Sequence, residues 1–214
     1  MIGNGLTVSP KELYCLGGVL NAKYIDYAYI AALDDIGQDF GLFKKETLAS
    51  LVAKGILTED FSGNMEIDEE YRRLLTPVFF GNVETSLNIC TIGEQLTVDI
   101  FNYHFYNDRI TLVKNQDNSL LLLPMSDEDI HDTVSALVAD RYSVESNIRI
   151  TDFDNAKVTR FFSAKSIDVG VASSVRTFIE HDGILCTETE ENGIVSLSRE
   201  DFINAVYEII KGAM

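Results

Sequence analysis

Two stretches of the chain share one pattern of apolar and polar positions. In residues 110–138, two apolar runs flank a polar turn and lead into an amphipathic segment that begins at Ser126. In residues 183–210, two apolar runs flank Asn192 and Gly193 and lead into a similar segment that begins at Ser198. Apolar runs around a polar turn predict a β-hairpin, and a serine three residues before an aspartate predicts a helix start. Each stretch therefore predicts a β-hairpin followed by a capped helix.

The two stretches also align on their apolar helix positions. Setting Ser126 on Ser198 places Ile130 on Phe202, Val134 on Val206, Leu137 on Ile209 and Val138 on Ile210. Strand–strand–helix units are common in α+β domains, so a chance match stays open. We predict an α+β fold with two pseudo-repeated units of antiparallel sheet plus flanking helices, related by a quasi-twofold axis.

The N-terminal part has helical spacing that is broken by one short hairpin. One helix is predicted to begin at Ser9 and Pro10, and another to follow Asp68. Two more helices are predicted between them, over residues 24–35 and over residues 44–54, the latter ending at Gly55. Residues 56–67 predict a small two-stranded hairpin between the last two helices. Three helices followed by a two-stranded wing are typical of a winged helix. This segment is therefore predicted to be winged-helix-like, which leaves DNA binding open as an alternative.

From residue 77 onward the period changes from helical to alternating. Residues 83–91 and 96–106 predict strands, which join the first hairpin in a four-stranded antiparallel meander over residues 83–123. Within the second strand, Phe101, Tyr103 and Phe105 share one face. They are our candidate partner-binding residues, and the alternative is that they are buried between the sheet and its helices.

A polar connection at residues 141–147 is the predicted internal boundary. We treat residues 1–214 as one domain with an N-terminal half, 1–140, and a C-terminal half, 141–214. Residues 148–151 predict a short strand, and residues 161–174 predict a loop or a short helix. A further strand over residues 176–180 is predicted to start the second sheet.

Charge and composition narrow the function classes. The chain has 214 residues, 46% of them hydrophobic, and 34 acidic against 17 basic residues, for a net charge of −17. This field repels phosphate backbones and anionic membrane surfaces, although acidity also serves solubility alone. Residues 1–80 hold seven basic and twelve acidic residues, so even the winged segment is acidic. We therefore predict no nucleic-acid partner.

The cysteines and the apolar runs indicate the compartment. Cys15, Cys90 and Cys186 are widely separated and lie in apolar runs, as buried thiols in a reducing compartment do. The N-terminus lacks the pattern of a signal peptide, and no apolar run approaches the roughly 20 residues that span a bilayer. We expect a cytoplasmic protein without membrane insertion.

The sequence contains no recognisable catalytic motif. His104, His131 and His181 lack the spacing of a metal site, and each is predicted to be a surface or half-buried histidine. Phosphate-binding loops and nucleophile elbows are absent from the sequence. The carboxylates fall at turns and helix starts, where negative charge favours the helix dipole. We therefore predict no enzyme, no metal and no cofactor.

The order of these segments resembles a known family. The helix SPKELYCLGGVL, the segments ETLASLVAKGILTED and GNMEIDEEYRRLLTPVFFGNVETSL, the meander and the repeated hairpin-plus-helix together resemble the EspG family of type VII (ESX) secretion chaperones. The resemblance implies a cytosolic, non-enzymatic chaperone with a quasi-twofold α+β fold, which binds a secreted helical-hairpin protein. A homodimer also stays open.

Two other functions remain as alternatives. One is a transcriptional regulator with an N-terminal winged helix and a C-terminal α+β sensor domain. The other is an enzyme with an unrecognised site, for which a polar cleft containing a histidine would be the first sign.

Overall fold

The chain forms two compact units, which are described separately. The computed structural model describes residues 5–31, 33, 39–138, 145–168 and 171–212, without the side chains of residues 168 and 171–173. Unit 1 comprises Met1–Gly81 and His104–Pro124, and unit 2 comprises Asn82–Tyr103 and Met125–Met214. The predicted boundary after residue 140 falls outside the described residues, so it stays a prediction.

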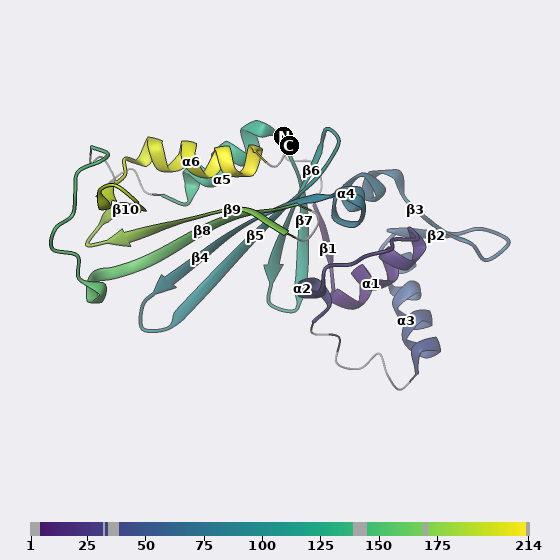
Figure 1. The fold of residues 1–214 in the computed structure, drawn as a ribbon. Helices are drawn as coiled ribbons and strands as arrows, with labels where there is room; N and C mark the ends of the chain where they lie inside the picture. The colour runs from purple at the N-terminus through teal and green to yellow at the C-terminus, as the bar shows by residue number, and fades with distance from the viewer. Residues whose placement is uncertain (1–4, 32, 34–38, 139–144, 169–170, 213–214) are drawn as a thin grey trace. The chain divides into compact units, whose positions relative to one another are not determined.

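Helices and strands alternate in blocks along the chain (Figure 1). Unit 1 contains β1 (Leu6–Val8), α1 (Pro10–Val19), α2 (Tyr27–Ile30), α3 (Phe40–Ala53), β2 (Leu57–Glu59), β3 (Met65–Ile67), α4 (Glu69–Phe80), β6 (Arg109–Gln116) and β7 (Ser119–Met125). Unit 2 contains β4 (Val83–Ile92), α5 (Asp127–Ala136), η1 (Asn155–Lys157), β8 (Val158–Asp168), β9 (Val171–His181), β10 (Ile184–Thr189), β11 (Gly193–Ser196) and α6 (Arg199–Lys211). Strand β5 (Leu96–Tyr106) belongs to both units.

The strand order confirms an α+β fold built on antiparallel pairing. Nine strands hydrogen-bond in the order β1-β7-β6-β5-β4-β8-β9-β10-β11, and β2 pairs with β3 in a separate hairpin. The predicted meander is confirmed, because β4, β5, β6 and β7 are neighbours in chain order.

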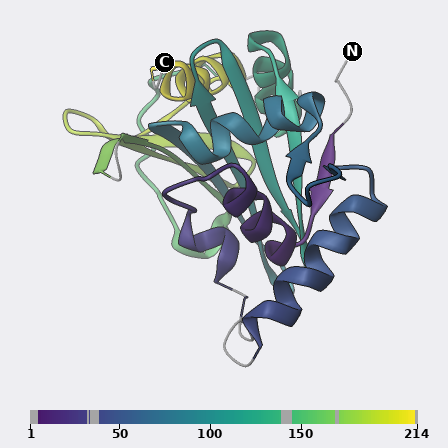
Figure 2. The ribbon, with the colours of Figure 1, turned by 90° about the vertical axis from the view of Figure 1, so that its right-hand side faces the viewer.

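Helix starts in unit 1 are set by short side-chain caps. In α1, Ser9 Oγ accepts the Glu12 N–H at 3.2 Å and the Glu12 carboxylate accepts the Ser9 N–H at 2.9 Å, as the capping box predicts. Helix α3 begins at Phe40 rather than at residue 44, because the Asp39 carboxylate caps it. Figure 2 shows α1 and α3 as neighbours, and both bury leucines in the core of unit 1.

Two helices of unit 1 differ from the sequence expectation. Helix α2 begins only at Tyr27, where Asp26 caps it, and the end of the predicted helix lies outside the described residues. Helix α4 continues through Pro77 to Phe80, although proline removes a backbone donor. In the same turn, the Leu74 carbonyl accepts the Thr111 hydroxyl at 2.9 Å, which ties α4 to β6.

In unit 2, the longest hairpin lies where the sequence predicted a loop or a short helix. That prediction was wrong, because residues 158–168 and 171–181 form strands β8 and β9, which pair with each other. The predicted strand at residues 148–151 is reduced to a single bridge between Arg149 and Val195. Helices α5 and α6 lie side by side over one face of the sheet (Figure 1).

Both predicted hairpin-plus-helix segments are confirmed locally. Ser126 and Ser198 are the N-caps of α5 and α6, and their hydroxyls accept N–H groups three residues on. Among the aligned apolar positions, Ile130, Val134, Phe202, Val206 and Ile210 are fully buried, whereas Leu137 and Ile209 are only partly buried. The sequence pattern therefore predicted both helices and their buried faces.

Candidate partner-binding surface

The structure buries the three aromatic residues that the sequence singled out. Phe101 is 7% exposed, Tyr103 0% and Phe105 6%. Burial also raises the pKa of the Tyr103 phenol above its ordinary value, so this hydroxyl stays neutral. Their role in partner binding stays a prediction, and any such role must work through the strand that they support.

A different set of apolar side chains is exposed on unit 2. Leu96, at the start of β5, is 66% exposed, and Val175 on β9 is 60% exposed. Ile92, Val98 and Phe161 are also at least one-third exposed. We call these five residues the apolar surface of unit 2. Clustered exposed apolar residues mark interaction sites more often than single ones do.

The strand register places part of this surface on one face of the sheet. Cys90 pairs with Phe161, and Phe161 pairs with Ile179, so the three side chains form one row across β4, β8 and β9. Ile92 lies two residues after Cys90 and therefore shares the same face. The next residue of β8 is Phe162, which points to the opposite face.

Helix α6 covers that opposite face. The Phe202 ring of α6 lies 4.9 Å from Phe162 and 5.0 Å from Phe178, both in edge-to-face geometry. All three rings are fully buried. The sheet of unit 2 thus has one face sealed by a helix, whereas the other face keeps exposed Phe161 and Val175.

Polar residues lie among the apolar ones on the open face. Ser163 pairs with Asn88 and Thr177, while Lys165 pairs with Ser86 and Val175. An apolar centre beside polar groups is the usual composition of a protein–protein interface. This arrangement can bind the apolar surface of another protein.

Two of the predicted surface histidines are buried, so the prediction was wrong for them. His104 is 5% exposed, its Nε2 lies 2.6 Å from the Tyr29 hydroxyl, and burial lowers its pKa to about 4. His181 is 4% exposed, stacks on Phe153 and accepts the Asp154 N–H. His104 and His181 therefore have packing and hydrogen-bonding roles.

The cysteines match the sequence expectation in part. Cys15 and Cys186 are buried free thiols, whereas Cys90 is half-buried. Burial raises the pKa of both buried thiols, to about 11 for Cys186. Among the described residues, His, Cys, Asp and Glu side chains form no group of three or more that could hold a metal. None of the helices in the described part of the chain is long and apolar enough to cross a membrane.

Sequence reasoning missed the exposed apolar residues for identifiable reasons. Leu96 and Val98 were recognised as the second apolar face of a strand, but exposure depends on which neighbours cover that face. Phe161 lay in the segment without a clear period. One sequence signal could have found Leu96 and Val98. They lie at the start of a strand, on the face opposite the aromatic residues of that strand.

Comparisons with known proteins extend this picture at the level of the fold. No protein-family model and no curated protein sequence matches the chain. Among solved structures, the chain is similar to the Mycobacterium tuberculosis type VII secretion system chaperone EspG5, whose structure was determined in complex with the PE25–PPE41 dimer. The similarity covers 99% of this chain and 97% of that chain, with a TM-score of 0.61 and 8% sequence identity. This similarity confirms the α+β fold that the family resemblance implied, whereas the quasi-twofold relation stays a prediction.

Proposed function

We propose that this chain is a cytoplasmic, non-enzymatic chaperone or adaptor of a type VII secretion system, which binds a cognate secreted helical-hairpin protein. The observation that carries the proposal is the fold similarity to EspG5, which extends over nearly the whole of both chains. EspG5 is a chaperone in complex with a PE25–PPE41 dimer. Full-length similarity favours a shared role, because the same elements are available to hold a partner.

The apolar surface of unit 2 is the surface that we propose for this partner. Leu96, Val98 and Phe161 leave apolar area in water that a partner would cover. Covering one Leu, Val or Phe side chain fully contributes about 1.5–3 kcal/mol. The β4–β5 tip and the open face of β8 and β9 together could therefore supply the apolar centre of an interface.

A comparative pull-down tests the proposal. The tagged chain would be expressed at native level in its own host, beside a Leu96→Asp/Val98→Asp variant and an Ile148→Asp control. Ile148 is 51% exposed on unit 2 but lies outside the apolar surface, so its change matches one of the two apolar-to-aspartate substitutions. We expect a small helical secreted protein to copurify with the wild type and the control but not with the double variant.

Two results would count against the proposal in different ways. Recovery of the wild type alone, with the secretion partners expressed, contradicts the chaperone function. Copurification that the double variant retains contradicts the assigned surface and leaves the function in place. Salt-sensitive binding of duplex DNA in a gel shift would instead support the regulator alternative.

The three aromatic residues of β5 that the sequence singled out have a structural role in this proposal. Phe101, Tyr103 and Phe105 are buried, so we infer that they hold β5 in place rather than contact a partner directly. A Phe101→Leu variant keeps an apolar side chain and is expected to retain the partner. Loss of copurification in a folded Phe101→Leu variant would favour direct contact.

Three finer features of the fold and assembly also belong to this proposal. The matching caps and buried positions of α5 and α6 support a pseudo-repeat with quasi-twofold symmetry. The order of α1, α2, α3 and the β2–β3 hairpin supports a winged-helix-like segment that packs rather than binds DNA. A homodimer is a further state, which light scattering of the purified chain would detect.

A further inference from the structure

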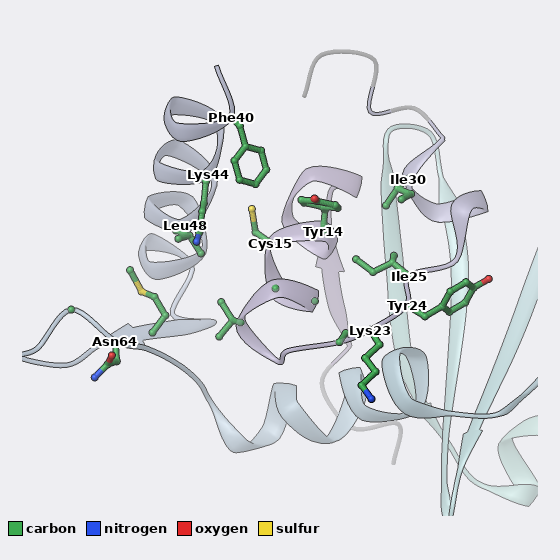
Figure 3. Close-up of a pocket in the computed structure, with 16 residues that line it drawn as sticks. Tyr14, Cys15, Lys23, Tyr24, Ile25, Ile30, Phe40, Lys44, Leu48 and Asn64 are labelled. Atoms are coloured by element: carbon green, nitrogen blue, oxygen red, sulfur yellow. The ribbon is translucent and has the colours of Figure 1, made fainter. Parts of the chain in front are cut away.

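A groove in unit 1 lies between α1, α3 and the tip of the β2–β3 hairpin (Figure 3). Its volume is about 740 Å³. Tyr14 and Cys15 on α1 face Phe40 on α3 across this space, and Leu48 continues the α3 wall. The Tyr14 and Phe40 rings meet edge to face at 6.5 Å. The walls therefore combine apolar and aromatic side chains with polar ones such as Lys44 and Asn64.

The charges of this groove are opposite to those of the chain. Among the residues that the structure describes, the charged side chains that line it are Lys23 and Lys44, and no aspartate or glutamate is among them. The whole chain, by contrast, has twice as many acidic as basic residues. Neither lysine forms an ion pair with any residue that the structure describes. Their charges are thus available to a ligand.

The combination of apolar residues and lysines continues along the outer face of α3. A second hollow of about 640 Å³ starts at Lys44 and Leu48 and runs past Lys45 and Val52, with Glu59 as its acidic lining residue. Phe40, which lines the groove, and Val52, which lines the second hollow, are 49% and 37% exposed. A helix normally turns such residues inward, so this apolar face is suited to a partner.

We propose that the groove of unit 1 binds an acidic amphipathic segment of a partner protein. Apolar side chains of this segment would pack on Tyr14, Phe40 and Leu48, while its carboxylates would pair with Lys23 and Lys44. Such a segment matches both the apolar walls and the local positive charge. This site is separate from the apolar surface of unit 2, and its existence does not depend on the secretion function.

The electrostatics favour a short peptide over a membrane or a nucleic acid. A large anionic surface would face the whole field of a chain with a net charge of −17, which repels it. A short segment brings few charges, and these lie next to the two lysines. At physiological ionic strength the Debye length is about 8 Å, so the more distant carboxylates of the chain are largely screened.

A charge-swap binding experiment tests this site. The probe is a fluorescein-labelled synthetic amphipathic helix of Leu, Phe and Glu, beside two versions in which each Glu is Gln or Lys. Fluorescence anisotropy at physiological salt measures the affinity for the full chain. We expect the Glu peptide to bind at least about tenfold more tightly than the Gln peptide, since several ion pairs are lost together. The Lys peptide should not bind to the wild type.

Substituting both lysines by glutamate should reverse the preference for the Glu peptide over the Lys peptide. Lys23→Glu/Lys44→Glu is expected to lose about tenfold in affinity for the Glu peptide and to gain binding of the Lys peptide. The control is Lys11→Glu on α1, which changes the charge outside the groove and places a carboxylate in the first helical turn, where it is tolerated. Carbodiimide coupling of the bound Glu peptide should join its carboxylates to Lys23 or Lys44.

Gly18 offers a second test that does not use charge. A Cβ atom at Gly18 would meet nothing within 4 Å, and Gly18 lines the groove. Gly18→Leu should therefore fill the groove and lower the affinity for the Glu peptide, whereas Gly18→Ala should bind this peptide as tightly as the wild type does. Circular dichroism would check that both variants are folded.

Several outcomes overturn the inference. No binding of the Glu peptide, equal binding of all three peptides, or an unchanged affinity in the lysine double variant would each exclude the acidic segment. A concentration-dependent dimer that Lys23→Glu/Lys44→Glu abolishes would assign the groove to a second copy of the chain. Displacement of the peptide by vesicles of anionic lipid would assign it to a membrane.

Discussion

Helix α1 in unit 1 is held by a buried carboxylate, whereas helix α6 in unit 2 is held by aromatic rings. The Glu12 carboxylate is 5% exposed and accepts hydrogen bonds from the Ser9 N–H, the Ser50 hydroxyl and the Lys54 ammonium. In unit 2, Phe202 packs edge to face on two strands of the sheet. Both anchors lie on the first turns of a capped helix, but their physical bases differ.

The two anchors should respond to different perturbations. The aromatic anchor depends on filled volume, so it is sensitive to truncation and indifferent to protonation. The carboxylate anchor depends on charge and on complete hydrogen bonding, so it is sensitive to both. Because Ser50 lies on α3 and Lys54 is its C-cap, the carboxylate also connects two helices that are distant in sequence. These differences give three kinds of variant with a graded series of effects.

Truncating the aromatic anchor should have the largest effect. Phe202→Ala leaves a cavity against Phe162 and Phe178, and such changes lower the free energy of unfolding by about 3–5 kcal/mol. Urea denaturation measures the loss, and hydrogen exchange should place it in α6, β8 and β9. Phe61→Ala is the control, because Phe61 is fully exposed and its loss should stay within about 0.5 kcal/mol. An effect of Phe202→Ala no larger than the control would show that these rings do not anchor α6.

The aromatic anchor was only partly predictable from the sequence. The inward position of Phe202 followed from the 3.6-residue period of its helix, and the structure confirms it. Its partners Phe162 and Phe178 were not found, because β8 contains adjacent phenylalanines followed by small and polar residues. Strand formation there is decided by pairing with β4 and β9 rather than by local propensity.

Replacing the carboxylate anchor should have an intermediate effect that is confined to unit 1. Glu12→Gln keeps the size of the side chain but removes the charge that Lys54 contacts at 2.7 Å. Losing a charged hydrogen-bond network in a buried position costs about 1–3 kcal/mol. Hydrogen exchange in α1 and α3 should increase, while α6 should be unchanged. Equal exchange in wild type and variant would remove Glu12 from the anchoring role.

The same residue makes unit 1 sensitive to acid. Burial alone raises the pKa of Glu12, but hydrogen bonds from Lys54, Ser9 and Ser50 outweigh it and lower the pKa below its ordinary value of 4.5. A lowered folded-state pKa contributes stability above the ordinary value, and this contribution is lost as the pH falls through the lowered value. The stability difference between wild type and Glu12→Gln should therefore shrink below about pH 4.5. A difference that stays constant down to pH 3 would contradict the ionised anchor.

The sequence predicted one half of the carboxylate anchor. The spacing of Ser9 and Glu12 indicated a capping box, and both of its hydrogen bonds are present. The partners Ser50 and Lys54 could not be found, because they lie on another helix and the contact exists only after the two helices pack. The same limit applies to the groove of unit 1, since Lys23 and Lys44 come together on one surface only in the folded unit.

Removing the N-cap hydroxyls alone should give the smallest loss of stability. Comparing this loss with those of the other variants separates the contribution of each anchor from that of its cap. Ser9 Oγ accepts the Glu12 N–H at 3.2 Å, and Ser198 Oγ accepts the Asp201 N–H at 3.1 Å. Ser9→Ala loses this bond, and Ser198→Ala loses it together with the bond that Ser198 Oγ donates to the Asp201 carboxylate; losing a cap of this kind costs about 1 kcal/mol. Ser9→Ala leaves the backbone N–H that Glu12 accepts, so thermal unfolding should show a smaller loss than for Glu12→Gln. If Ser9→Ala matched Glu12→Gln, α1 would be held by its cap rather than by the buried charge, and the contrast between the two units would disappear.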